Sequence, residues 1–273
     1  MKAALRLLLL AISFFVLIPP FASLPTAQKC LQKKTRLCST RPPSRDLAQV
    51  SDPTSSGNGS GSSRSTKSGQ GFGKKSTRSH NLLVVGLGNP GSDYDGTRHN
   101  VGFAALDAFA VANKGILKST SKFGADYGAI RIGNKNVGLL KPTTYINNSG
   151  KPLKAIMEHF KLQPADILVL ADDVSLDCGD VKIKARASHG GHNGHRDIET
   201  ILGTREYTRV RIGVGAPATR GDLVSHVLSS FSSSEQLHIS TAVAACCNII
   251  TDWVSQDDLQ FVIDKYNNGQ KQA

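Results

Sequence analysis

From residue 82 onward, short apolar runs alternate with longer amphipathic segments, and this alternation limits the possible folds more than any other feature. Short apolar runs indicate buried strands, and we expect strands at 82–85, 127–132, 137–140, 167–170, 181–185 and 209–214. Apolar residues at helical spacing predict helices at 101–110, 149–159, 194–202, 236–254 and 257–266. Alternating strands and helices without repeats predict one globular α/β domain over residues 81–273. Its twisted sheet should be mixed, mostly parallel and flanked by helices.

The basic charge of the chain is concentrated in its N-terminal part. Residues 1–80 contain 13 Lys and Arg against 2 Asp, a net charge of +11. Residues 81–273 contain 20 basic and 19 acidic residues, a net charge of +1. This balance excludes a general polyelectrolyte binder for the predicted domain, so any nucleic-acid site there must be a local patch.

Residues 1–28 have the composition of a secretory signal peptide. Lys2 and Arg6 precede an apolar run over residues 7–18, and the small residues Ala22 and Ser23 follow it. The run is shorter than the roughly 20 residues that a membrane-spanning helix needs. We therefore expect no stable membrane association, with a permanent anchor as the alternative.

Residues 29–80 resemble an organelle transit segment. They contain eleven Lys and Arg against Asp46 and Asp52, and they are rich in Ser, Thr, Gly and Pro. Such a segment cannot bury a core, so we expect it to be disordered. A signal peptide followed by a transit-like segment is similar to the two-part presequence of plastids acquired by secondary endosymbiosis. The sequence thus predicts a plastid location, with the mitochondrion or secretion as alternatives.

Residues 86–91 (GLGNPG) match the glycine pattern of dinucleotide-binding sites directly after a predicted strand. That site requires a helix to begin at once and an acidic residue about 20 positions later. Residues 92–97 favour a loop instead, and no such acid follows. The Cys residues of the domain lack metal-ligand spacing. We expect neither a cofactor nor a metal, and we expect the glycines to place Asn89 in a pocket at the end of the first strand.

His99 and Asp172 are the candidate catalytic pair. His99 directly precedes the helix at 101–110, which Asn100 is expected to cap, and the positive end of a helix disfavours protonation of the ring. A neutral imidazole can accept a proton from water. Asp172 ends a buried strand, where α/β sheets gather ligands, and could orient the imidazole. The alternatives are a hydrogen-bonded loop histidine and a turn acid.

Three asparagines occupy comparable positions after strands or before helices: Asn89, Asn147 and Asn193. Each alone could be a helix cap or a turn residue. Together they could donate amide hydrogen bonds to a developing oxyanion. No Ser or Cys is in a nucleophile motif, so the residues favour ester or amide hydrolysis by water.

Strand alternation predicts a basic face on two strands, over residues 181–186 and 209–212. The cations that would form it are Lys182, Lys184, Arg186, Arg209 and Arg211. Few aromatic residues accompany them, so the patch suits duplex phosphates better than stacked single-stranded bases. An ordinary solvated sheet face is the alternative.

Four segments closely resemble motifs of the bacterial-type peptidyl-tRNA hydrolases, in order and at the expected spacing. They are residues 85–91 (VGLGNPG), 97–102 (TRHNVG), 141–147 (KPTTYIN) and 189–194 (HGGHNG). The resemblance spans most of residues 81–273 and implies an organelle-targeted form of this family. It implies hydrolysis of the ester that joins a peptide to the 3′ end of tRNA, by a monomeric α/β domain without metal or cofactor.

The resemblance also implies a role for individual residues. His99 corresponds to the general base, Asp172 to its carboxylate partner and Asn89 to a third catalytic residue. The residues expected to bind the substrate are Tyr94, Tyr145, Asn147 and Asn193. Lys184 and Arg211 correspond to the pair that holds the 5′-phosphate beside the acceptor stem of the tRNA.

The chain departs from the family pattern at several positions. Ser175 stands where a second acid is usual, and His195 stands where leucine is usual. Residues 185–188 replace a glycine-rich stretch, and residues 177–178 replace a segment in which proline is common. A serine at 175 is also similar to plastid relatives that serve as group II intron splicing subunits. A non-hydrolytic RNA- and protein-binding role is therefore the alternative function.

Overall fold

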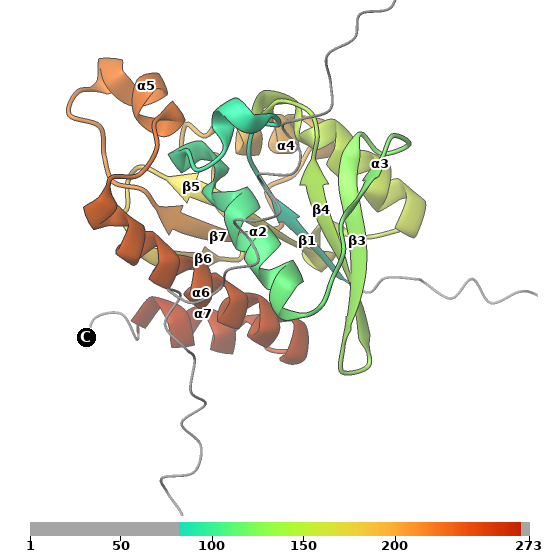
Figure 1. The fold of residues 1–273 in the computed structure, drawn as a ribbon. Helices are drawn as coiled ribbons and strands as arrows, with labels where there is room; N and C mark the ends of the chain where they lie inside the picture. The colour runs from blue at the N-terminus through green and yellow to red at the C-terminus, as the bar shows by residue number, and fades with distance from the viewer. Residues whose placement is uncertain (1–81, 269–273) are drawn as a thin grey trace, which may run out of the picture. The chain divides into compact units, whose positions relative to one another are not determined.

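The computed structural model describes residues 82–268, and the predicted signal and transit segments lie outside this range. Seven strands form one sheet (Figure 1). They are β1 (Leu82–Gly86), β2 (Lys118–Thr120), β3 (Ala125–Ile132), β4 (Lys135–Pro142), β5 (Ile167–Asp173), β6 (Val181–Lys184) and β7 (Thr208–Gly213). The α-helices are α2 (Val101–Ala112), α3 (Gly150–Phe160), α4 (Asn193–Leu202), α5 (Leu223–Leu228), α6 (Ser233–Ser255) and α7 (Leu259–Asn268).

The sheet order is β2-β3-β4-β1-β5-β7-β6. β1 pairs in parallel with β4 and β5, and β5 pairs in parallel with β7. The pairs β2–β3, β3–β4 and β6–β7 are antiparallel. Five of the seven strands therefore run in one direction, with β3 and β6 opposed, which confirms the prediction of a mixed, mostly parallel sheet.

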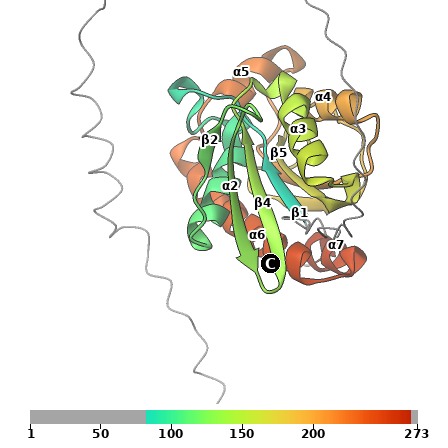
Figure 2. The same ribbon diagram turned by 90° about the vertical axis from the view of Figure 1, so that its right-hand side faces the viewer.

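Helices cover both faces of the sheet. α2 and α6 lie on one face, and α3 and α4 lie on the other (Figures 1 and 2). Alternate residues of the central strands divide between the two layers because successive side chains point to opposite faces. Val84 packs in the layer that includes α2 and α6, whereas Leu83 and Val85 pack in the layer that includes α3 and α4.

Two glycines bring the first turn of α2 against the strands. A Cβ atom on Gly86 would lie 2.5 Å from the carbonyl oxygen of Gly102, and one on Gly102 would lie 2.5 Å from that of Leu170. Real side chains do not fit at such distances, so both positions require glycine. This contact holds the residues that precede α2 over the carboxyl ends of β1 and β5, the edge where parallel sheets bind ligands.

The predicted elements are present, with differences at their ends. β3 and β4 pair as far as Ile132 and Lys135, which leaves a two-residue turn, and β5 continues through Asp173. β2 and α5 were not predicted. α6 is long and apolar enough to cross a membrane by length and composition, but residues such as Ile249 and Ile250 are buried in the core of the domain.

Candidate active site

A cavity of about 300 Å³ opens beside the carboxyl ends of β5 and β7. Five of the predicted site residues line it: His99, Asp172, Asn193, Lys184 and Arg211. Basic side chains line one part of the cavity. Another part is apolar and is formed by side chains of α5, namely Leu223, Val224 and Val227. The structure therefore brings these five predicted residues to one cavity, whose apolar wall was not predicted.

The structure brings His99 and Asp172 into direct contact. His99 lies in the 3₁₀ turn η3 (Arg98–Asn100), and its Nδ1 is 2.8 Å from Oδ1 of Asp172. The side chains are 10% and 3% exposed, so the pair is largely withdrawn from water. A carboxylate only accepts hydrogen bonds, so Nδ1 carries the proton and the other ring nitrogen, Nε2, keeps its lone pair.

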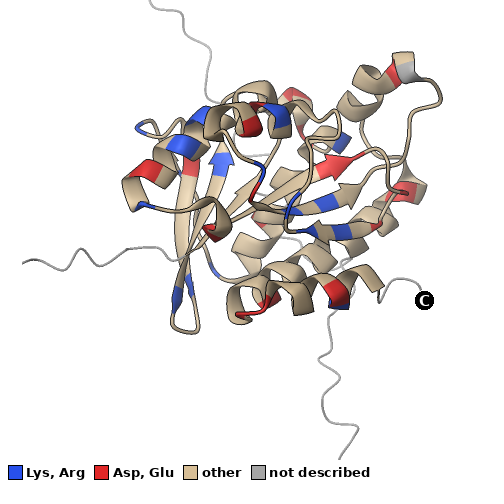
Figure 3. Ribbon diagram, turned by 180° about the vertical axis from the view of Figure 1, so that it is seen from behind, with Lys and Arg blue, Asp and Glu red and all other residues tan. Residues whose placement is uncertain are grey.

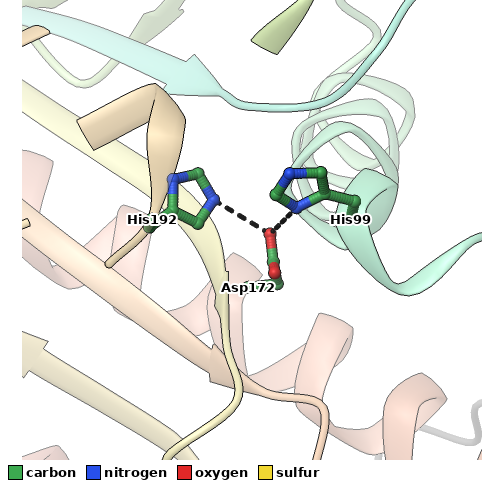
Figure 4. Close-up of side chains that lie close together, drawn as sticks. All are labelled: His99, Asp172 and His192. Carbon is green, nitrogen blue, oxygen red and sulfur yellow. Dashed lines mark hydrogen bonds and ion pairs between the residues drawn. The ribbon is translucent and has the colours of Figure 1, made fainter. Parts of the chain in front are cut away.

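A second histidine contacts the same carboxylate oxygen. Nε2 of His192 lies 3.0 Å from Oδ1 of Asp172, so two rings flank this oxygen (Figure 4). Burial alone would raise the pKa of the Asp172 carboxyl, but His192 and then His99 hold it well below its usual range. Asp172 is therefore a carboxylate at neutral pH. The HGGH motif contained His192, but sequence spacing gave no sign that it would reach Asp172.

His99, Asp172 and His192 also form the one group among residues 82–268 whose ligand atoms lie close enough to hold a metal ion, within 4.8 Å of one another. Imidazole nitrogen and carboxylate oxygen are zinc ligands. The two short contacts, however, each join a ring nitrogen to one carboxylate oxygen at hydrogen-bond distance. We therefore interpret the three side chains as a hydrogen-bonded group and not as a metal site.

Asn89 is buried and fixed in orientation by its neighbours. Its backbone N–H donates to Oδ1 of Asn100 at 2.8 Å, and Nδ2 of Asn100 donates to its carbonyl oxygen at 3.0 Å. Its own Oδ1 accepts from the backbone N–H of Ile146 at 2.9 Å. The Nδ2 group is thus the end of the Asn89 amide available to a substrate oxygen. Asn100 is at the N-cap position of α2, as predicted, but its side chain makes no cap hydrogen bond and holds Asn89 instead.

Three other predicted substrate residues lie beyond the lining of the His99 cavity. Tyr94 and Tyr145 meet edge to face with ring centroids 6.2 Å apart, and Asn147 is exposed in the 3₁₀ turn η4 (Ile146–Asn148). Asn89, which accepts from the backbone N–H of Ile146 next to Tyr145, is also outside the set of residues that line the cavity. The structure therefore forms an adjoining aromatic surface rather than one pocket containing all the predicted residues.

Asn193 is the first residue of α4, and its Oδ1 accepts from Nη1 of Arg196 at 2.8 Å. It is exposed at the cavity, where an incoming ligand could replace this surface hydrogen bond. The cap of α4 is the preceding residue, His192, whose side chain accepts from the backbone N–H of His195.

The basic patch is smaller than strand alternation predicted. Figure 3 shows basic residues on neighbouring strands at the edge of the sheet. Arg209, however, is 1% exposed, and its guanidinium donates to Glu199 of α4 and to the carbonyl oxygen of Ser188. Lys182 donates to the carbonyl oxygen of Asn267. These bonds withdraw Arg209 and Lys182 from the surface that could bind phosphate.

Lys184 and Arg211 remain at the cavity, together with Arg186, whose Nη1 lies 3.0 Å from a carboxylate oxygen of Glu206. Lys184 is exposed, and Arg211 is held from one side by Asp173 and by Oγ of Ser175 at 3.0 Å. Burial would raise the pKa of the Asp173 carboxyl, but hydrogen bonds from Ser175 and Arg211 lower it. Arg211 is thus oriented by a carboxylate and a hydroxyl, while its remaining donors can meet a phosphate.

Arg98 anchors the segment that carries His99, a role that sequence reasoning missed. Its Nη2 donates to both carboxylate oxygens of Glu235 at 2.9 Å, and its Nη1 donates to Ser229 and to the carbonyl oxygen of Ser230. The side chain is 9% exposed. The ion pair ties η3 to α6, and the bonds to Ser229 and Ser230 tie it to the chain that follows α5, the helix of the apolar wall.

A histidine with a buried carboxylate partner and nearby amides, at the ligand-binding edge of an α/β sheet, is an arrangement with which hydrolytic enzymes activate water. The sequence profile of the family described as "Peptidyl-tRNA hydrolase" matches residues 83–273. The chain belongs to the peptidyl-tRNA hydrolase family.

Individual relatives agree with this membership. The chain is 41% identical over 170 residues to the peptidyl-tRNA hydrolase of Neisseria meningitidis serogroup A, covering 62% of this chain and 88% of that protein. It is 44% identical over 154 residues to that of Mycobacteroides abscessus, covering 56% and 79%. The crystal structure of peptidyl-tRNA hydrolase from Acinetobacter baumannii is similar with a TM-score of 0.66 and 33% identity, covering 68% of this chain and 94% of that one.

Proposed function

We propose that this protein hydrolyses the ester bond of peptidyl-tRNA, releasing the peptide and free tRNA, with His99 as the general base. The observation that carries the proposal is the contact between Nδ1 of His99 and the buried carboxylate of Asp172 at a basic cavity. That contact leaves Nε2 of His99 as a proton acceptor. The family membership supplies the substrate class.

The reaction proceeds in two steps. In the first, a water oxygen attacks the ester carbonyl carbon while Nε2 of His99 takes one water proton. Asp172 stabilises the imidazolium that forms, and amide N–H groups of Asn89 and Asn193 donate to the oxyanion. In the second, the bond to the ribose 3′-oxygen breaks and His99 returns its proton to that oxygen. The products are a peptide carboxylic acid and a tRNA with a free 3′-hydroxyl.

The substrate spans the two parts of the site. The 5′-phosphate of the acceptor stem binds Lys184 and Arg211, which are cations at the cavity with donors available. Arg186 lies at the same cavity and is paired with Glu206. The peptide extends toward Tyr94 and Tyr145, whose aromatic surface accepts varied side chains without charge selection. Asn147, exposed beside them, hydrogen-bonds the peptide backbone.

Hydrolysis of an N-blocked aminoacyl-tRNA by the purified protein tests the function. We expect release of the blocked amino acid, and we expect release to fall when the tRNA lacks its 5′-phosphate. A purified, folded protein that binds this substrate without cleaving it would refute the proposal and would favour the splicing alternative. The relatives reported above are named as hydrolases, so we do not propose the splicing role.

We also propose that residues 1–80 direct the protein to a plastid and that the catalytic domain acts as a monomer. The support for import is the signal-like run over residues 7–18 followed by a basic, acid-poor segment. A fusion of residues 1–80 to a fluorescent protein should accumulate in the plastid, and fluorescence in mitochondria or in the medium would refute the address. Sedimentation should give the mass of one chain.

A further inference from the structure

We propose that His192 is a positioning residue of the hydrolytic reaction: it caps α4 with one ring nitrogen and therefore must donate its other ring N–H to Asp172. The inference rests on the proposed function, since it concerns the carboxylate partner of His99. It assigns a role to a residue for which the sequence analysis offered none.

The contact at the start of α4 determines the tautomer of His192. Its Nδ1 accepts a hydrogen bond from the backbone N–H of His195 at 3.2 Å, which is the N-cap contact of α4. A neutral imidazole has one donor and one acceptor nitrogen. Because Nδ1 is the acceptor, the proton lies on Nε2, which is 3.0 Å from Oδ1 of Asp172. The helix end thus selects the tautomer that the carboxylate needs.

Neighbouring residues hold the His192 ring in one orientation. Gly194 lies under it, and a Cβ atom there would come within 3.0 Å of Cε1 of His192. The ring packs between two other histidines, with centroids 5.1 Å from His99 and 5.0 Å from His195. His192 is therefore confined from three sides in the orientation that Figure 4 shows.

The hydrogen bond from His192 to Asp172 affects His99. Oδ1 of Asp172 accepts one N–H from each histidine. The hydrogen bond from His192 therefore weakens the interaction of the Asp172 carboxylate charge with His99. A carboxylate that loses this second donor stabilises the His99 imidazolium more strongly and is also free to rotate. The His192 donor thereby reduces the negative charge that acts on His99 and fixes the direction of Asp172.

Apart from His99 and His192, the charged groups near the cavity have no described bond to Asp172. Asp173 and Arg211 of the neighbouring strands bond each other, and Arg209 bonds Glu199. His195 of α4 stays neutral, because burial lowers its pKa well below the usual value. Lys184, Arg186 and His189 also face the cavity, without a described bond to Asp172.

Two substitutions at position 192 separate the roles of the two ring nitrogens. In His192→Asn, the side-chain oxygen can still cap α4, because asparagine is a good N-cap residue, but the side chain is too short to reach Asp172. In His192→Gln, the amide nitrogen can reach Asp172, but the cap is lost. His238→Gln, at an exposed histidine of α6, is the matched control.

In the full chain, we expect His192→Asn to unfold at about the parental temperature, with kcat reduced about tenfold because Asp172, without the His192 N–H, is no longer held in its direction toward His99. The acid limb of its kcat/KM profile should move to higher pH by about half to one unit. His192→Gln should lower the unfolding temperature but keep the acid limb near its parental position. The control should change neither quantity.

An unshifted acid limb in His192→Asn, at unchanged thermal stability, would overturn the proposal. Titration of the His99 ring by nuclear magnetic resonance gives the same comparison without turnover, since the protonation midpoint should rise in His192→Asn. If the parental protein does not hydrolyse the ester, the proposed function fails, while this titration still decides whether His192 controls His99.

Discussion

Replacement of Asp172 by asparagine tests the electrostatic basis of the proposed mechanism. Oδ1 of Asp172 accepts from two histidine N–H groups, so an asparagine oxygen can take the same place and preserve both tautomers. What changes is the charge opposite the imidazolium that forms on His99. Two unit charges about 4 Å apart interact by about 4 kcal/mol at an effective dielectric constant of about 20, which corresponds to about 10³-fold in rate.

We therefore expect Asp172→Asn to lower kcat about 10³-fold on N-blocked aminoacyl-tRNA, with little change in KM. Single-turnover hydrolysis measures the chemical step directly. The matched control is Asp173→Asn on the same strand, where the carboxylate contacts Arg211 instead of His99. It should keep kcat within about threefold and change KM. An Asp172→Asn protein that retains a tenth of the parental kcat would refute the argument that this charge stabilises the transition state.

Three other substitutions test separate parts of the structure. His99→Ala should leave tRNA binding intact and lower turnover by about 10²–10⁴-fold, the usual contribution of a general base; cleavage at the parental rate would remove His99 from that role. Arg211→Ala should raise KM and reduce the slope of log affinity against log salt by about one, while sparing substrates that lack a 5′-phosphate; equal losses on both substrates would contradict the phosphate contact. Arg98→Met removes a largely buried guanidinium and should lower the free energy of unfolding by about 2–4 kcal/mol in urea titrations. Burial would raise the pKa of Glu235, but Ser232 and Arg98 bring it from 4.5 to about 2, so its stabilising contribution is complete above about pH 4.5 and is lost as the pH falls toward 2. Arg98→Met should weaken this acid dependence, and an unchanged dependence would show that Arg98 does not set it.

Local periodicity was sufficient to predict most of the elements and to bring His99 and Asp172 to the same end of the sheet. The run at 167–170 and the acid pair after it placed Asp172 at the end of a central strand, and the histidine before α2 faces that end. Both inferences use residues that are neighbours in the chain or obey a general rule of sheet geometry. The short elements β2 and α5 were missed because segments of three and six residues hardly differ from loops in composition.

The missed contacts are those that depend on packing between distant segments. Alternation placed Arg209 correctly on one face of its strand, but only the folded chain shows that Glu199 of α4 covers it. Asparagine is a common helix cap, but the backbone of Asn89 lies beside Asn100 in the folded chain. The side-chain amide of Asn100 therefore bonds the N–H and the carbonyl oxygen of Asn89 instead of capping α2. The contact of His192 with Asp172 likewise depends on where α4 begins in space. Sequence spacing alone could predict none of the three.

The bonds of Arg98 have a consequence for synthesis of the protein on the ribosome. The residue beside the proposed base is held by Ser229, Ser230 and Glu235, more than 130 positions later in the chain. A nascent chain that has not yet released this part from the exit tunnel lacks the anchor of its own catalytic loop. Activity should therefore arise only near the end of translation, and a protein cut short before residue 229 should remain inactive even though every proposed catalytic side chain has already been made.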